Sequence, residues 1–342
     1  MSEPLLRVEG LRTWFPIRSG LFQHSVGHVR AVDDVSFEVP AGGTLALVGE
    51  SGCGKTTVGL SLLRLVQPQA GRAWFDGEDL LALGPDAIRE RRREIQIVFQ
   101  DPMASLDPRL RIRDAVAEGM HAFGIGENEA DRTERVAALL SRVQLDPDAM
   151  WRYPHEFSGG QRQRVCIARA LAVEPRLVVC DESVSALDVS IQAQILNLLS
   201  ELQEERQLSY LFITHDLSVV RYLADRVAVM YLGQIVEEGE TERVFAQPAH
   251  PYTEGLLAAI PSVDPAARRL RPRVRGDVPS PSDPPPGCRF HTRCGEVFGR
   301  CTREAPGFYP VQDGGARCFL RQTPEGPPVG ATAGPAESPA SG

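Results

Sequence analysis

The residue pattern with the clearest chemistry lies in one glycine-rich segment, Gly49-Glu-Ser-Gly-Cys-Gly-Lys-Thr-Thr57, which fits G-x-x-x-x-G-K-T. Its glycines let the backbone fold around an anion with its N–H groups pointing inward. Lys55 can then reach the β- and γ-phosphates of a nucleotide, and the Thr56 hydroxyl can bind Mg²⁺. A glycine-rich turn that binds nothing is the alternative. The predicted phosphate-binding residues are Gly49, Glu50, Ser51, Gly52, Cys53, Gly54, Lys55, Thr56 and Thr57.

Acidic and histidine side chains follow two later apolar runs. Asp181 and Glu182 end the run that starts at Leu177, and His215 follows the run from Tyr210. A carboxylate at a strand tip can hold Mg²⁺, which prefers hard oxygen ligands. The next carboxylate can orient and polarise a water aimed at the γ-phosphate. An acidic pair or a single histidine is more often structural, but a phosphate loop in the same chain favours a catalytic interpretation.

These side chains need elements that bring them together. The apolar runs 44–48, 177–181 and 210–214 predict buried strands, and the apolar spacing of 58–65 predicts a helix directly after the phosphate loop. The apolar run from Ile95 predicts a further strand, which ends in Gln100. If the strands are parallel, their tips meet at one edge of the sheet, where open α/β sheets bind ligands.

The first 39 residues have a different pattern. Alternating apolar and polar residues around 6–11 and 29–39 predict two strands of an antiparallel sheet. Trp14 and Phe15 lie in the segment between them, which also carries Phe22. An aromatic side chain here could stack on a nucleobase, although a core or loop aromatic is the commoner case.

Residues 101–157 predict an inserted helical subdomain, with helices over 112–122 and 132–143 separated by Pro, Gly and Asp. A helix is predicted over 162–173, and a β-hairpin over 226–239.

Composition limits the class of protein. The chain has 342 residues, of which 42% are apolar, and a net charge of −8. That charge argues against binding to the phosphate backbone of nucleic acid. No apolar run approaches the roughly 18–20 residues that a membrane span needs, and no secretory leader opens the chain. We therefore expect a cytosolic protein.

Four of the seven cysteines crowd together near the end of the chain. They are Cys288, Cys294, Cys301 and Cys318, with five, six and sixteen residues between them. In a reducing cytosol this crowding favours metal over disulfides. Four thiolates suit a [4Fe–4S] cluster or a tetrahedral zinc ion, and His291 is a possible substitute ligand. The same spacing is also compatible with free thiols that bind no metal. Residues 321–342 have the composition of a disordered tail.

Taken together, these motifs resemble those of ABC-transporter ATPase subunits over about residues 5–245. The resemblance rests on motifs in family order: the phosphate loop, Gln100, Phe157-Ser-Gly-Gly-Gln161, Asp181-Glu182, Ser185-Ala-Leu-Asp188 and His215. It implies an α/β fold: a P-loop NTPase with a RecA-like mixed core sheet, an N-terminal antiparallel β-subdomain, the helical insertion and a small Cys-rich extension. The implied cassette spans 1–247, and the extension spans 248–320. Phe157 departs from the leucine that is commoner in the family.

The resemblance also implies roles for single residues. Gly49 to Thr57 would hold the ATP phosphates, with Thr56, Asp181 and Gln100 at the Mg²⁺ ion. Glu182 would be the catalytic base, His215 would contact the γ-phosphate, and Gln100 would link the lytic water to the membrane subunits. Phe15 would stack on adenine, with Trp14 as the second choice. The residues implied to face the γ-phosphate held by a second ATPase subunit are Ser158, Gly159, Gly160 and Gln161.

His250-Pro-Tyr-Thr253 and the cysteines resemble the C-terminal extension of the oligopeptide/dipeptide importer branch, in which similar members carry an iron–sulfur cluster. That branch implies an ATP-hydrolysing subunit for peptide import at the cytoplasmic face of the plasma membrane. Its partners would be a second ATPase subunit, two transmembrane permeases and, indirectly, an extracytoplasmic solute-binding protein. Nickel or another small solute is the alternative cargo. The cassette motifs alone are also compatible with a soluble ABC ATPase acting on nucleic acid or ribosomes, or with a catalytically silent cassette.

Overall fold

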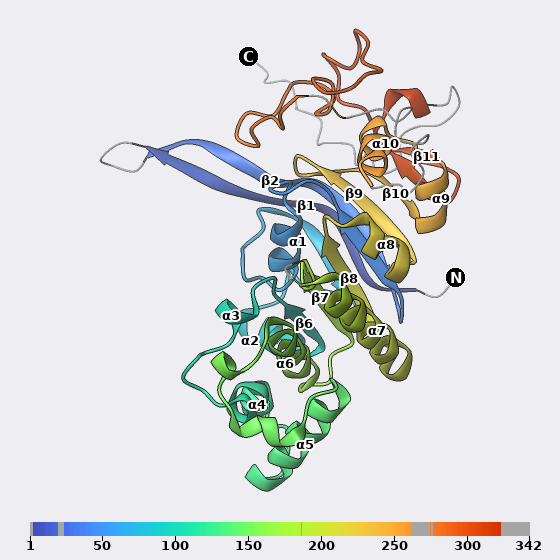
Figure 1. The fold of residues 1–342 in the computed structure, drawn as a ribbon. Helices are drawn as coiled ribbons and strands as arrows, with labels where there is room; N and C mark the ends of the chain where they lie inside the picture. The colour runs from blue at the N-terminus through green and yellow to red at the C-terminus, as the bar shows by residue number, and fades with distance from the viewer. Residues whose placement is uncertain (1–2, 20–23, 186, 261–273, 275, 323–342) are drawn as a thin grey trace, which may run out of the picture.

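The structure of the protein is a computed structural model that describes residues 3–19, 24–185, 187–260, 274 and 276–322 (Figure 1). Phe22, Ala186 and all of the predicted disordered tail beyond residue 322 lie outside the described residues. Among the described residues, no helix has the length and apolar character required to cross a membrane.

An antiparallel sheet is built from the N-terminal part of the chain. Its strand order is β2-β1-β4-β5, with bounds β1 (Pro4–Ser19), β2 (His24–Pro40), β4 (Ala70–Phe75) and β5 (Glu78–Asp79). Strands β1 and β2 are longer than predicted and project from the body as a hairpin (Figure 1).

Trp14 and Phe15 therefore lie within β1, and the expectation that they lie between strands was wrong. β1 also tolerates Pro16, which pairs with His28. Beyond Arg12 the described part of β1 has only β2 as a sheet neighbour, and proline is accepted in such edge segments.

The second sheet is mixed and forms the centre of the molecule. Its order is β11 (Tyr309–Val311), β12 (Gly314–Ala316), β10 (Gln234–Glu240), β9 (Arg226–Tyr231), β3 (Thr44–Val48), β8 (Ser209–Thr214), β7 (Leu177–Asp181) and β6 (Ile95–Val98). The five strands from β9 to β6 are parallel, and the first three are antiparallel to their neighbours. All residues of β3, β7 and β8 are buried, as expected for parallel strands covered on both faces.

The predicted hairpin is confirmed as β9 and β10. Its two turn residues, Leu232 and Gly233, both have positive φ, of 42° and 79°. This is the backbone that a two-residue turn between twisted antiparallel strands requires. Beyond β10 the sheet continues into β12 and β11, so residues 309–316 add two strands to the sheet that carries the predicted site.

The helices have the following bounds: α1 (Lys55–Leu62), α2 (Pro85–Glu94), α3 (Pro102–Ser105), α4 (Ile112–Ala122), α5 (Glu129–Arg142), α6 (Gly159–Leu171), α7 (Val189–Arg206), α8 (Leu217–Leu223), α9 (Thr241–Ala246) and α10 (Pro251–Ala258). Short 3₁₀ turns are η1 (Pro147–Trp151), η2 (Pro154–Glu156) and η4 (Phe319–Arg321). Helix α5 begins earlier than predicted because the Asn128 side chain caps it, accepting from the N–H groups of Ala130 and Asp131.

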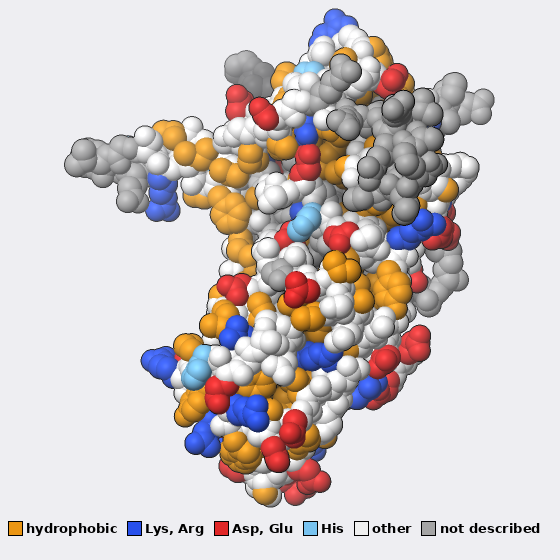
Figure 2. Space-filling model, viewed as in Figure 1, with side chains coloured by type: hydrophobic (Ala, Val, Ile, Leu, Met, Phe, Trp, Pro, Cys, Tyr) orange, Lys and Arg blue, Asp and Glu red, His pale blue; other side chains and the backbone are white. Residues whose placement is uncertain are grey.

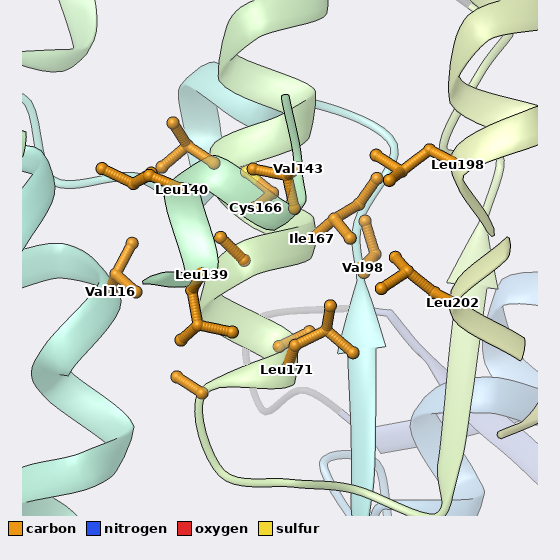
Figure 3. Packing of buried hydrophobic residues seen from close by; sticks show 14 of the residues in the cluster. Val98, Val116, Leu139, Leu140, Val143, Cys166, Ile167, Leu171, Leu198 and Leu202 are labelled. Atoms are coloured by element: carbon orange, nitrogen blue, oxygen red, sulfur yellow. The ribbon is translucent and has the colours of Figure 1, made fainter. Parts of the chain in front are cut away.

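The helical subdomain shares one apolar core with the sheet. Figure 3 shows Val116, Leu139 and Leu140 of α4 and α5 on one side of α6, with Val98 of β6 and Leu198 of α7 on the other. Helix α6 therefore joins the helical subdomain to the strands that carry the predicted site. Phe157 is buried in the same core, so an apolar side chain suits this position.

Candidate nucleotide site

The carboxyl ends of the central strands lie at one edge of the sheet. Val48 of β3 pairs with Thr214 of β8, and Asp181 of β7 pairs with Ile213. The three predicted strand tips are therefore neighbours, and parallel pairing puts the phosphate loop, Glu182 and His215 at the same edge. Figure 2 shows the molecule hollowed between the projecting hairpin and the helical subdomain, and Figure 1 places α1 at the root of that hairpin.

The phosphate loop requires glycine at two positions. Gly49 has φ 156°, and a Cβ added there would lie 2.2 Å from the carbonyl oxygen of Met230. Gly54 has φ 108°, and a Cβ would lie 1.9 Å from the carbonyl oxygen of Ala31. The buried Lys55 side chain folds back over the loop, where its Nζ donates to the carbonyl oxygens of Gly49 (2.8 Å) and Glu50 (3.1 Å). The loop is thus packed into the sheet with an ammonium group at its centre.

Two hard oxygen ligands meet beside this loop. The Thr56 hydroxyl donates to Oδ1 of Asp181 at 2.9 Å. Burial raises the pKa of Asp181, and the neighbouring Glu182 charge raises it further, while the Thr56 hydrogen bond lowers it. The exposed Thr56 hydroxyl and the buried Asp181 carboxylate provide oxygen ligands that fit a magnesium ion, and the ion would favour the ionised form of the carboxylate.

The three predicted water-positioning side chains are also in contact. Oε2 of Glu182 accepts from the Gln100 amide at 2.9 Å, and Oε1 of Glu182 lies 3.4 Å from Nδ1 of His215. Glu182 has a positive φ of 45°, and its N–H donates to the Ile213 carbonyl oxygen. A left-handed conformation at a non-glycine residue costs about 1–3 kcal/mol and is found preferentially at functional sites. The arrangement can orient a water and accept its proton.

Ser158 caps α6, and Gly159 and Gln161 lie in the first turn of that helix. The Ser158 hydroxyl accepts from the Gln161 N–H, and the Gln161 side chain accepts from the Ser158 N–H, forming a capping box. The cap explains why α6 starts at Gly159 rather than at the predicted residue 162. Ser158 and Gly159 are exposed, so they can meet a neighbouring molecule, whereas Gly160 is buried against Ile191.

Of the two candidate aromatic residues, Phe15 is the more accessible. Its exposed fraction is 39%. Trp14 is half-buried, with the Arg30 guanidinium 5.1 Å from its ring centroid and the His28 ring 6.0 Å away.

The four C-terminal cysteines line one cavity. It is also bordered by His250, Phe290, His291, Phe298 and Phe319. Burial raises the pKa of Cys288 to about 11 and also raises the pKa values of Cys294 and Cys318. Within the described parts of the chain, no group of three or more His, Cys, Asp or Glu side chains is arranged to hold a metal ion.

Two side chains of the C-terminal extension reach the phosphate loop, and the sequence does not predict either contact. Arg293 forms two hydrogen bonds to the Glu50 carboxylate, and the Tyr252 hydroxyl accepts from the Glu50 N–H at 3.0 Å. An arginine between two cysteines and a tyrosine in a short helix carry no local signal of this contact.

The fold and the site define a phosphate-loop ATPase of the ATP-binding cassette class. The family pattern described as ABC transporter matches residues 32–185, and that of the oligopeptide/dipeptide transporter C-terminal region matches residues 236–301. The chain is 50% identical to the Probable peptide ABC transporter ATP-binding protein y4tS of Sinorhizobium fredii over 322 residues, covering 94% of this chain and 91% of the relative. It is also 50% identical to the Oligopeptide transport ATP-binding protein AppF of Bacillus subtilis, over 90% of this chain and 94% of AppF.

A solved bacterial ABC transporter cassette, the dimeric MJ0796, superposes with a TM-score of 0.61 at 26% identity, over 69% of this chain and 98% of the cassette. The chain belongs to the ABC transporter ATP-binding family, in the group that carries the oligopeptide/dipeptide transporter C-terminal region. It is accordingly an ATPase that binds ATP and Mg²⁺.

Proposed function

We propose that this chain is an ATP-hydrolysing subunit that powers peptide import through an ABC transporter. The observation that carries the proposal is the meeting of Lys55, the Thr56–Asp181 pair and the Glu182–His215–Gln100 group at one sheet edge. The C-terminal region supports peptide as the cargo, as do the names of the two relatives described above.

Within this proposal, residues 49–57 hold the ATP phosphates. Thr56 and Asp181, with Gln100 near them, hold the magnesium ion, which would neutralise charge on the phosphates. Glu182 accepts the proton of the attacking water. His215 contacts the γ-phosphate and positions that water.

A second cassette completes the site. The exposed Ser158 hydroxyl and the N–H group of Gly159 suit the γ-phosphate bound by that second subunit, together with the positive end of α6, while the buried Gly160 lets the helix pack closely against Ile191. ATP then holds the two subunits together, and hydrolysis releases them. That change in population can drive two permease subunits between access states. We place the chain on the cytoplasmic face of the membrane, docked through residues 101–157.

The test is purification of the tagged chain in detergent from its native membrane. We expect two multi-span proteins and a second cassette to copurify, and reconstituted ATPase activity to rise with peptide and solute-binding protein. If nickel stimulates the ATPase activity and peptides do not, the cargo is nickel and not peptide. Copurification with ribosomes or nucleic acid in place of membrane proteins would contradict the proposal.

Adenine stacking predicts a first substitution effect. We expect Phe15→Ala to raise the KM for ATP by about 5- to 150-fold, because stacking of a base on an aromatic ring contributes about 1–3 kcal/mol. Trp14→Ala, whose ring is already covered by Arg30, is the matched control and should change KM less. If Trp14→Ala raises the KM for ATP more than Phe15→Ala does, and both variants keep the parental thermal stability, then Trp14 and not Phe15 is the residue that stacks on adenine.

We further place a [4Fe–4S] cluster in the cysteine-lined cavity of the extension. Four thiols around one cavity provide the donor set. A zinc ion held by the same thiolates is the alternative. Bound there, the cluster would link Cys288, Cys294, Cys301 and Cys318.

This placement predicts the metal content. Chain purified without oxygen should hold about four iron and four sulfide ions, and Cys294→Ser should lose most of them and unfold at a lower temperature. Cys166→Ala removes a buried cysteine outside the cavity and should retain the iron. Loading should fall as the pH falls, because protons compete with the iron for the cysteine thiolates, and burial, which raises the pKa of Cys288 to about 11, strengthens that competition. One zinc ion per chain, or no metal, would contradict the cluster.

A further inference from the structure

An arginine of the C-terminal extension is paired with an acid of the phosphate loop. Nη1 of Arg293 lies 2.7 Å from Oε2 of Glu50, and Nη2 lies 3.0 Å from Oε1. The side chain of Arg293 is 6% exposed and that of Glu50 is 29% exposed. Two parallel N–H···O bonds of this kind fix orientation as well as charge. The pair joins residues 243 positions apart in the chain.

The arginine is held in place by an aromatic block. Its guanidinium lies 5.7 Å from the ring centroid of Tyr231. Tyr231 packs against Tyr252 and Phe290, with ring centroids 4.7 and 5.3 Å apart. Tyr252 is fully buried, and its hydroxyl accepts from the Glu50 N–H. One residue of the phosphate loop is therefore held through its backbone and its side chain by the extension.

The charge of Glu50 explains why such a pair matters for ATP. The carboxylate belongs to the loop proposed to wrap the triphosphate, and like charges at short range repel strongly where water is partly excluded. Arg293 neutralises that carboxylate. The loop also contains Gly49, Gly52 and Gly54 at positive φ, so contacts that fix its shape before ATP arrives reduce the entropy lost on binding.

We propose that Arg293 is a positioning residue for ATP binding, through which the C-terminal extension neutralises and fixes Glu50 and so completes the phosphate loop. Tyr252 assists through the Glu50 backbone. This inference rests on the proposed role of residues 49–57 in holding the ATP phosphates.

The test is a double-mutant cycle in the full-length chain, with a fluorescent ATP analogue for binding and phosphate release for turnover. Arg293→Gln should weaken nucleotide binding about 5- to 50-fold and raise KM by a similar factor, with a smaller change in kcat. Glu50→Gln combined with Arg293→Gln should recover most of the lost affinity, because the unpaired carboxylate is gone. Arg293→Lys keeps the positive charge but cannot form two parallel hydrogen bonds to the Glu50 carboxylate, so its affinity for nucleotide should lie between those of the parent and of Arg293→Gln.

Arg300→Gln is the matched control, since Arg300 pairs with the exposed Glu304 in the same extension. It should bind nucleotide like the parent. Tyr252→Phe keeps the ring and removes the hydroxyl, and should weaken binding by a smaller factor even if Arg293→Gln fails to fold. Parental affinity in both Arg293→Gln and Tyr252→Phe would overturn the inference, as would an absence of rescue in the folded double variant. A parent chain that binds no nucleotide would instead contradict the proposed function.

Discussion

Glu182→Gln should lower the steady-state rate of ATP hydrolysis by about 10²- to 10⁴-fold, the usual contribution of a positioned general base. Glutamine has nearly the same shape as glutamate, and its carbonyl oxygen can still accept the hydrogen bond that Gln100 donates to Glu182 at 2.9 Å. It cannot accept a proton from water. ATP binding should change little, because Lys55, Thr56 and Asp181 are untouched.

The measurement has two parts. Phosphate release gives kcat. Light scattering after gel filtration gives the molecular mass in the presence of ATP. Under that condition the Glu182→Gln chain should accumulate as an ATP-bound dimer, whereas the parent hydrolyses its ATP and separates. Glu204→Gln, an exposed glutamate on α7, is the matched control and should behave like the parent. A kcat within tenfold of the parental value would assign the base to another residue.

The parts of the site that were predicted from sequence are encoded locally. The phosphate loop is one segment in which strand, glycines and helix follow one another. Asp181 ends β7, Glu182 directly follows that strand and His215 directly follows β8, so the rule that parallel strands end at one edge was sufficient to bring them together.

Contacts between distant parts of the chain could not be predicted in the same way. The Glu50–Arg293 pair depends on where the extension folds back, and nothing near either residue specifies that. The addition of β12 to β10 is a second example, because three-residue strands carry almost no periodic signal. The pairing in turn explains why the extension stays close to the nucleotide site.

Residues 158–161 show how one motif can serve two purposes. Their Ser-x-x-Gln spacing is a helix cap as well as a family signature, and the cap starts α6 at Gly159, three residues before the predicted start at residue 162. The cap uses the Ser158 oxygen as an acceptor and leaves its O–H free to donate. The cap therefore leaves a hydroxyl donor at the N-terminus of α6, where an anion can accept its hydrogen bond.

Gly159→Asp should abolish both ATP-driven pairing and ATP hydrolysis, the largest effect we expect at the subunit interface. The residue is exposed, its φ lies outside the left-handed region, and an added Cβ would meet only Leu187 Cδ2 at an ordinary 3.8 Å. A carboxylate in the first turn of α6 should stabilise that helix by about 0.3–1 kcal/mol. The isolated chain should thus remain folded while its new charge repels the γ-phosphate of the second subunit.

The substitution is best tested in the Glu182→Gln background, where ATP would otherwise trap the pair. We expect the Gly159→Asp, Glu182→Gln chain to stay a monomer with ATP, with thermal unfolding no lower than that of Glu182→Gln. Ala130→Asp adds the same charge at the exposed start of α5 and should leave pairing intact. If the second cassette is a different chain, the mixed pair should lose hydrolysis only of the ATP held by that partner. The prediction fails if the Gly159→Asp, Glu182→Gln chain still pairs with itself in ATP and the mixed pair also keeps full hydrolysis. That result would mean that α6 does not face the neighbour's nucleotide.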